Sequence, residues 1–332
     1  MRNSVGATCL SLSRSLCVAP MMAWTDRHCR YLHRLAAPRA LLFTEMITAN
    51  ALQHGPAERL LRYDPSEHPV AIQLGGSDPG LLGEAARLAM DAGYDEINLN
   101  VGCPSPRVSK GRFGACLMQE PELVRDCVAA MCAAAPLPVT IKCRLGVDDA
   151  DSDDLLDRFI EITRAGGCDV YYIHARKALL KGLSPAQNRS APPLQYARAY
   201  RLRERFPDLR FIVNGGIETT EQVREHLTRL DGVMIGRAAY HNPLRLAEMH
   251  AVVFGGEPVD SHALLAGYRA HVERELATGT RLADMTRHAL GLFAGSPGAR
   301  RWRRLMSDAA RLRANDIGLL DEALALIEPM AA

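Results

Sequence analysis

The feature that most constrains the fold is a regular alternation of eight short apolar runs with amphipathic segments of helical periodicity. The runs are rich in β-branched residues and apolar along their length, which is typical of parallel strands covered on both faces. We expect strands at residues 16–19, 41–44, 70–74, 96–100, 139–143, 170–174, 210–213 and 233–236. Helices are expected between most of them, including residues 80–92, 121–134, 152–165 and 219–227.

Eight strand–helix units within about 230 residues have the size and rhythm of a (β/α)₈ TIM barrel, an α/β fold. The alternative is an open doubly wound sheet, which usually carries a G-x-G-x-x-G turn after its first strand. This chain has no such turn, and its glycine-rich segment 75–80 has a different spacing. Pro79 in that segment is better placed to begin a helix. The sequence therefore predicts the barrel.

The last quarter of the chain differs, because the strand pattern stops near Pro258 and helical periodicity follows. We predict three parts: an N-terminal tail at 1–14, a barrel at 15–250 and a small all-helical domain at 255–332. Residues 281–313 carry eight arginines and two aspartates, a local net charge of +6 in a chain of net charge +2. Such a cluster favours contact with nucleic-acid phosphates, and a solvated helix face is the alternative.

Composition excludes several classes of protein. With 48% hydrophobic and 23% charged residues, the 332-residue chain can bury a core and does not resemble disordered, collagen or coiled-coil sequences. Nine cysteines without a C-x-x-C spacing argue against disulfides and zinc, so we expect free thiols and no metal centre. We see neither a signal peptide nor a membrane span, and we expect a cytoplasmic protein.

Polar side chains lie where the predicted strands end, which is where TIM barrels place their active sites. These rim residues include Met21, Met22, Glu45, Gln73, Asn98, Asn100, Lys142, Arg144, His174, Asn214 and Arg237. Lys142 lies within an apolar strand, where an inward lysine must meet an anion or a polarised ring such as a flavin. A buried carboxylate partner for Lys142, and a core position for His174, are the alternatives.

Glycines follow the seventh and eighth predicted strands, in Asn214-Gly215-Gly216 and in Gly236-Arg237. Glycine allows the backbone to approach a ligand closely, and free backbone N–H groups can bind a phosphate. The loops after strands 7 and 8 are the usual phosphate site of this fold. The spacing therefore predicts a phosphate site, with ordinary turns as the alternative.

Cys103 follows the fourth predicted strand, in a rim loop between Gly102 and Pro104. A free thiol, with a pKa of about 8.5, is mostly protonated at neutral pH and can act as a general acid. Beside a base or cation it would instead be a nucleophile, and a small buried hydrophobic residue is the plainest alternative. The loop position favours a chemical role, whereas Cys116 and the other cysteines fit packing.

At these residues the chain resembles the tRNA-dihydrouridine synthases, most closely their A subfamily. The shared strings are Val18–Met22, Trp24–Arg27, Phe43–Met46, Ala71–Gly76, Glu96–Pro104, Ile173–Lys177, Asn214–Ile217 and Gly236–Arg237. The segments 183–189 and 298–304 resemble the A subfamily in particular. Similarity extends over about residues 16–310, and the string that contains Cys103 is its most specific part.

The resemblance implies a barrel that binds FMN and reduces the 5,6 double bond of uridine in the tRNA D-loop, with NADPH as reductant. Hydride would pass from FMN N5 to C6, and Cys103 would protonate C5. By match to the family, FMN would be held by Pro20, Met21, Met22, Gln73, Lys142, His174, Asn214, Gly215, Gly216, Gly236 and Arg237.

The same resemblance implies that the target base is extruded from the tRNA into the barrel mouth. The residues assigned to tRNA are Asn100, Arg144, Arg189, Arg300 and Arg303. The A-subfamily match points to uridines 20 and 20a, and we expect a monomer with neither DNA nor a membrane as partner. Two rival functions are a flavin barrel acting on small pyrimidines or enones, and a colourless RNA-binding protein without activity.

Overall fold

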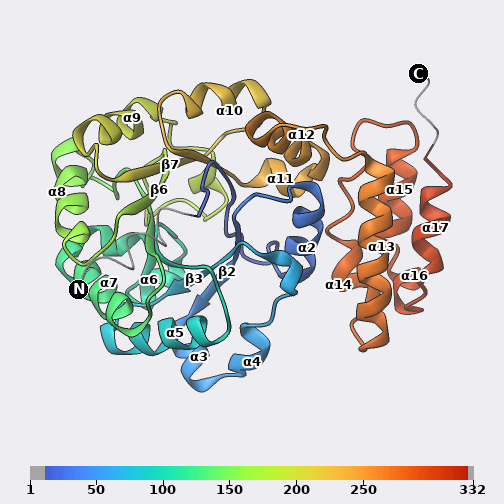
Figure 1. Ribbon diagram of the computed structural model, residues 1–332, viewed down its shortest axis with the longest axis horizontal. Helices are drawn as coiled ribbons and strands as arrows, with labels where there is room; N and C mark the ends of the chain where they lie inside the picture. Colours follow the sequence, from blue (N-terminus) through green and yellow to red (C-terminus); the bar gives the residue numbers. More distant parts are fainter. Residues whose placement is uncertain (1–11, 328–332) are drawn as a thin grey trace.

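The computed structural model describes residues 12–327 and contains the predicted (β/α)₈ barrel (Figure 1). Its eight strands pair in parallel in the order β1-β8-β7-β6-β5-β4-β3-β2, and hydrogen bonds between Leu41 and the β1 backbone bring the two edges together. The strands are β1 (Leu16–Val18), β2 (Leu42–Thr48), β3 (Val70–Gly75), β4 (Glu96–Val101), β5 (Val139–Arg144), β6 (Val170–His174), β7 (Arg210–Asn214) and β8 (Gly232–Ile235).

Strand β2 is the one strand whose bounds differ from the predicted ones by more than a residue. Its pairing with β3 shifts register between Phe43 and Met46, and the strand then continues to Thr48. Glu45 therefore lies inside β2 at a bulge, whereas we had expected it after the strand. Bulges of this kind re-aim side chains and are common at barrel rims.

Helices surround the barrel, and their ends follow the local signals in the sequence (Figure 1). Pro79 is the first residue of α5, as predicted, and Asp78 caps that helix by accepting from Leu81 N at 2.9 Å. The α-helices of the barrel are α2 (Arg27–Ala36), α3 (Ala49–His54), α4 (Ala57–Leu60), α5 (Pro79–Asp91), α6 (Pro106–Lys110), α7 (Pro121–Ala134), α8 (Asp153–Arg164), α9 (Tyr196–Arg205), α10 (Thr220–Leu227), α11 (Arg237–His241) and α12 (Pro243–Phe254). Three short 3-10 turns join them, at η1 (Pro65–Glu67), η2 (Gly114–Gln119) and η3 (Gln187–Arg189).

The C-terminal helices form a group beside α2, on the right in Figure 1. They are α13 (Ser261–Ala277), α14 (Leu282–Thr286), α15 (Ala299–Met306), α16 (Ala309–Arg313) and α17 (Gly318–Leu324). Residues 287–298 separate α14 from α15. Residues 1–11 of the predicted tail and 328–332 of the predicted helical domain lie outside the described residues.

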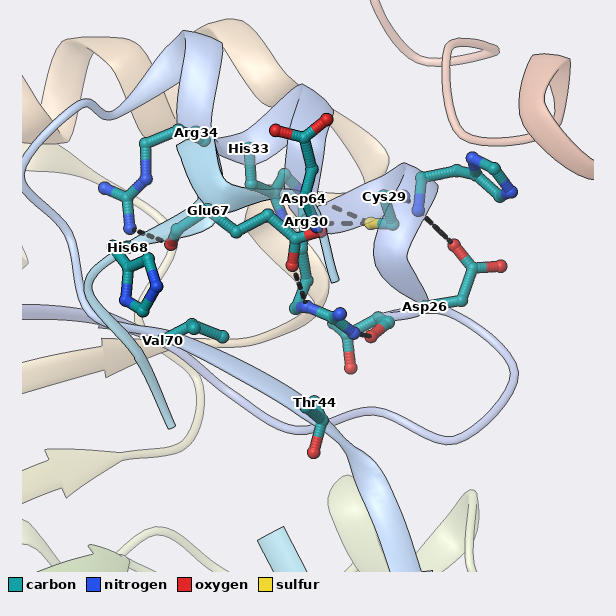
Figure 2. A network of polar contacts seen from close by, with 12 residues as sticks. Asp26, Cys29, Arg30, His33, Arg34, Thr44, Asp64, Glu67, His68 and Val70 are labelled. Carbon is teal, nitrogen blue, oxygen red and sulfur yellow. Dashed lines mark hydrogen bonds and ion pairs between the residues drawn. The ribbon is translucent and has the colours of Figure 1, made fainter. Parts of the chain in front are cut away.

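Helix α2 is fixed to the barrel by a buried polar network (Figure 2). Arg30 Nε donates to Glu67 Oε2 at 2.5 Å, and Arg34 Nη2 donates to the Glu67 carbonyl at 2.8 Å. Glu67 also closes a capping box by accepting from Asp64 N at 2.8 Å. Arg34 Nε is the one atom of these side chains that is buried without a partner among the described residues. The remaining bonds hold α2 against the barrel, and the C-terminal helices pack on that helix.

The barrel interior is apolar around Phe43, Tyr172 and Met234. Near the N-terminal ends of the strands it contains an ion pair, in which Arg14 Nη2 lies 2.6 Å from Glu96 Oε2 and both side chains are buried. Within residues 12–327, no helix has both the length and the apolar character that crossing a bilayer requires.

Candidate active site

A cavity of about 700 Å³ opens where the strands end, a volume that suits a cofactor-sized molecule. Its lining includes these sequence-predicted residues: Pro20, Met21, Met22, Gln73, Asn100, Cys103, Lys142, Arg144, His174, Arg189, Asn214, Gly215, Gly236 and Arg237. Four predicted residues do not line it, and one of them is Asn98, which is fully buried within β4. Gly216 lies between Gly215 and Ile217, which both line the cavity, while Arg300 and Arg303 are on α15 in the C-terminal helices.

Cys103 is held in the loop after β4 through both of its backbone polar groups. Its N–H donates to Asn100 Oδ1 at 3.0 Å, and its carbonyl accepts from Ala115 N at 2.9 Å. Gly114 packs directly beneath it, since a Cβ there would lie 2.6 Å from the Cys103 carbonyl oxygen. The half-buried Cys103 therefore lies at the cavity on a fixed backbone. A fixed backbone suits a side chain that must be held in position against one atom of a substrate.

Lys142 extends inward from β5 and lies against an amide. Its Nζ donates to Asn214 Oδ1 at 3.0 Å, and Asn214 Nδ2 donates to the Met234 carbonyl at 2.8 Å. Within the described residues no carboxylate pairs with Lys142, so the buried ion pair that we had considered does not form. Burial, helped by the nearby Arg144 charge, lowers the pKa of Lys142 to about 8. An anion in the cavity would raise that pKa again.

Arg144 connects two rim loops. Its Nε donates to the Gly102 carbonyl at 2.9 Å, and its Nη1 donates to the carbonyls of Lys177 and Asn188 at 3.1 and 2.9 Å. The guanidinium thereby holds the Cys103 loop against the loop that follows β6. Burial lowers the pKa of Arg144 to about 10.

His174 ends β6 inside this cationic wall. Burial and the charges of Arg144 and Lys142 hold the pKa of His174 well below its usual value. The imidazole is therefore neutral at physiological pH, so it can accept a hydrogen bond at one nitrogen and donate at the other.

The glycines after β7 and β8 differ from one another. Gly215 and Gly216 have φ of 113° and 68°, and a Cβ would lie 2.7 Å from His174 Cδ2 in the first case and 2.5 Å from Leu194 Cδ1 in the second. The local turn thus requires both of them to be glycine. A Cβ on Gly236 would meet no protein atom nearer than 3.8 Å, so space beside its backbone opens to the cavity.

Charge in the cavity is unbalanced. Among the described residues that line it, Glu45 is the only acid, against five cations: Arg107, Lys142, Arg144, Arg189 and Arg237. Glu45 is itself engaged, because its Oε1 accepts from Ala23 N at 2.5 Å, and burial raises its pKa. This surplus of positive charge suits an anionic ligand.

Sequence reasoning did not assign a role to Arg107, Thr48 or Phe113, which also line the cavity. Arg107 and Phe113 lie within ten residues of Cys103, in a segment rich in proline and glycine. That position in the sequence could have been used to predict that both residues line the cavity. Thr48 reaches the rim only because β2 is longer than predicted.

The arginines of residues 281–313 divide into paired and unpaired groups. Arg281 pairs with Asp284, Arg287 with Asp26 and Arg311 with Glu322. On α15, Arg300 and Arg303 are exposed and have no acidic partner within residues 12–327. Trp302, between them in sequence, is buried and donates from Nε1 to the Ala289 carbonyl at 3.1 Å, which anchors the helix. Arg300 and Arg303 therefore give α15 two positive charges without an acidic partner in the described part of the chain.

Comparison with known proteins gives consistent matches. Residues 17–328 match the family described as dihydrouridine synthase. A tRNA-dihydrouridine(20/20a) synthase of Vibrio cholerae is 53% identical over 94% of this chain and 96% of its own length. Proteins of the same name from Xanthomonas axonopodis pv. citri and Escherichia coli K12 are 54% and 51% identical, over 94% and 93% of this chain and over 93% and 90% of their own lengths.

Proposed function

The chain belongs to the dihydrouridine synthase family, and we propose that it reduces the 5,6 double bond of uridines in the D-loop of tRNA. The names of its relatives support positions 20 and 20a as the targets. The observation that carries the proposal is the cavity itself, where a fixed cysteine lies beside five cations and, among the described lining residues, a single acid.

FMN fits the residues that line this cavity. Its phosphate is an anion, and the cavity has a surplus of cations with open space beside the Gly236 backbone. Its ring system carries carbonyl oxygens, which can accept from Lys142 and Gln73. We assign FMN binding to the set expected from the family, namely Pro20, Met21, Met22, Gln73, Lys142, His174, Asn214, Gly215, Gly216, Gly236 and Arg237.

When bound and reduced by NADPH, FMN supplies the hydride that passes from its N5 to C6 of uridine. The protein supplies the proton, from the Cys103 thiol to C5, because that thiol lines the cavity on a backbone fixed by Asn100. Lys142 adds positive charge where negative charge develops on the ring system. Arg144 keeps the Cys103 loop closed against the loop after β6.

The tRNA contacts divide between the barrel mouth and the C-terminal helices. We assign Asn100, Arg144 and Arg189 to the extruded base and its nearest phosphates, since all three line the cavity. Arg300 and Arg303 on α15 would neutralise phosphates farther away. Residues 15–250 would thus form the catalytic FMN-binding barrel, and residues 255–332 the tRNA-binding domain.

The proposal is tested by incubating the protein with FMN, NADPH and tRNA transcribed without modifications, followed by nucleoside mass spectrometry. We expect dihydrouridine at positions 20 and 20a, and none when free uridine replaces tRNA. Reduction of free pyrimidines or enones, with tRNA unchanged, would instead identify a small-molecule reductase. Binding of tRNA by a colourless protein without NADPH oxidation would identify an RNA-binding protein.

A further inference from the structure

A continuous column of hydrogen bonds runs through the barrel from the Cys103 loop to the opposite end. Asn100 Nδ2 donates to Gln73 Oε1 at 2.8 Å, and Gln73 Nε2 donates to Asn98 Oδ1 at 2.8 Å. Asn98 Nδ2 then donates to Thr140 Oγ1 at 2.9 Å, whose hydroxyl donates to Glu96 Oε1 at 2.8 Å. All five side chains are buried, so each bond lies in a medium of low dielectric constant.

The direction of this column is fixed independently at each end. At the rim, the backbone N–H groups of Gly102 and Cys103 can only donate, so Asn100 must turn its Oδ1 toward them. At the far end, the Glu96 carboxylate accepts from Arg14 and from Tyr172 Oη at 2.9 Å, so Thr140 must donate to it. Thr140 is also closer to that carboxylate than to the Ile97 carbonyl, at 2.8 against 3.3 Å. Both ends therefore require the same orientation of every amide between them.

This orientation determines what the cavity presents to a ligand. Each side-chain amide nitrogen carries two hydrogens, and Gln73 and Asn100 each use one of them within the column. Both residues line the cavity, and within residues 12–327 no acceptor is paired with the second hydrogen of either. Together with Lys142, these amides make the inner wall a donor surface, which is complementary to carbonyl oxygens and unprotonated ring nitrogens.

We propose that Glu96, Thr140 and Asn98 are positioning residues that keep the amide N–H groups of Gln73 and Asn100 directed at the ligand. None of the three lines the cavity, so any effect on the ligand must pass through the column. The ligands themselves, FMN at Gln73 and the extruded base at Asn100, rest on the proposed function, whereas the direction of the column rests on the hydrogen bonds alone.

The test compares three variants, each of which removes or exchanges a single heavy atom of the side chain. Thr140→Val removes the hydroxyl that links Asn98 to Glu96, while Thr140→Ser retains it. Tyr172→Phe is the matched control, because it removes a buried bond to the same Glu96 oxygen but lies outside the column. Two quantities are measured: hydrogen exchange of the Gly102 and Cys103 amides without ligand, and FMN affinity with the midpoint potential of bound FMN.

We expect Thr140→Val to speed exchange at Gly102 and Cys103 and to weaken FMN binding roughly threefold to tenfold, the value of about one hydrogen bond. We also expect it to lower the FMN midpoint potential, since fewer donors face the reduced ring. Thr140→Ser and Tyr172→Phe should match the parent. The proposal is overturned if Thr140→Val also matches the parent, or if Tyr172→Phe is equally impaired. If the parent protein binds no FMN, the proposed function fails. Hydrogen exchange at Gly102 and Cys103, compared between Thr140→Val and the parent, still tests whether the column holds the Cys103 loop.

Discussion

Cys103 and Cys116 lie in one segment, yet their surroundings differ. Cys103 lines the cavity, whereas the Cys116 thiol donates to the Phe113 carbonyl at 3.2 Å and lies outside the cavity lining. The sequence distinguished these two cysteines through the glycine and proline beside Cys103. What it could not show is the contact of Asn100 with the Cys103 backbone, although the residues are only three apart, because that contact depends on the path of the loop.

Replacement of Cys103 by alanine should separate two half-reactions. We expect Cys103→Ala to bind FMN and oxidise NADPH normally, while dihydrouridine formation falls by about 10²- to 10⁴-fold, as for loss of a general acid. Both rates are measured on one preparation, with Cys116→Ala as control because it changes a thiol of the same segment. Dihydrouridine formation at the parent rate in Cys103→Ala would show that another group delivers the proton.

A second prediction concerns the glycines after β7 and β8, Gly215 and Gly236. We expect Gly236→Ala to weaken FMN binding with a small change in Tm, because its Cβ meets no protein atom nearer than 3.8 Å. Gly215→Ala should lower Tm more, since φ is 113° and the Cβ would lie 2.7 Å from His174. FMN titration and thermal unfolding of both variants test this. Full FMN affinity in Gly236→Ala would place the phosphate elsewhere.

The positions of the strands were easier to predict from the sequence than the set of side chains that line the cavity. Runs rich in buried apolar residues indicate where β3 to β7 lie, because a strand covered on both faces is apolar over most of its length. The bulge in β2 was not predictable, since it depends on register against β3 and leaves no local signal. That bulge puts Glu45 and Met46 within the strand and carries Thr48 to the cavity rim.

A further prediction concerns the contribution of helix α15 to tRNA binding. We expect Arg300→Ala with Arg303→Ala to weaken tRNA binding and to reduce the salt slope, log Kd against log salt, by up to about 2. NADPH oxidation should be unchanged, because neither residue lines the cavity. The measurement is a binding titration at several salt concentrations.

The control for the α15 variant removes two arginines, and so the same amount of positive charge, from helices of the barrel. Arg158 on α8 and Arg224 on α10 have exposed side chains, at 65% and 63%, and their double alanine variant should bind tRNA almost as the parent does. If the α15 variant retains the parent affinity and slope, α15 is a solvated surface and tRNA docks on the barrel alone.

At the scale of the whole molecule, α2 joins the barrel to the C-terminal helices. His28 on α2 faces His271 on α13, with Nδ1 and Nε2 3.0 Å apart, and Arg27 pairs with Glu275 beside them. These partners are more than 240 positions apart in sequence, so no local pattern could have predicted the contact. The sequence indicated that a second, helical domain exists but not which barrel helix supports it.

The histidine pair should make stability depend on pH. Burial lowers the pKa of both His28 and His271 to about 4, from 6.5. As pH falls below about 6.5 the unfolded chain binds protons that the folded chain resists, so stability is full above that pH and declines toward pH 4. Burial acts to raise the pKa of Glu275, but the hydrogen bonds from Arg27 and Thr280 and the nearby positive charge of Arg27 together lower it to about 2.

We therefore expect Tm to fall between pH 7.5 and 5, and His271→Gln to reduce that fall. Thermal unfolding across this range is the measurement, with His262→Gln as control because His262 starts the same helix and is exposed. A Tm that does not change over the range, or an equal decline in His271→Gln, would show that the interface does not titrate.

We propose that one barrel mouth holds both the reductant and the proton donor for a uridine in tRNA. A single-turnover experiment measures both together: protein with FMN is reduced by NADPH without oxygen, freed of excess NADPH and mixed with unmodified tRNA. We expect one dihydrouridine for each flavin reoxidised, and far slower reoxidation when Cys103 is alanine. Flavin that stays reduced in the presence of tRNA, or is reoxidised without dihydrouridine appearing, would contradict it.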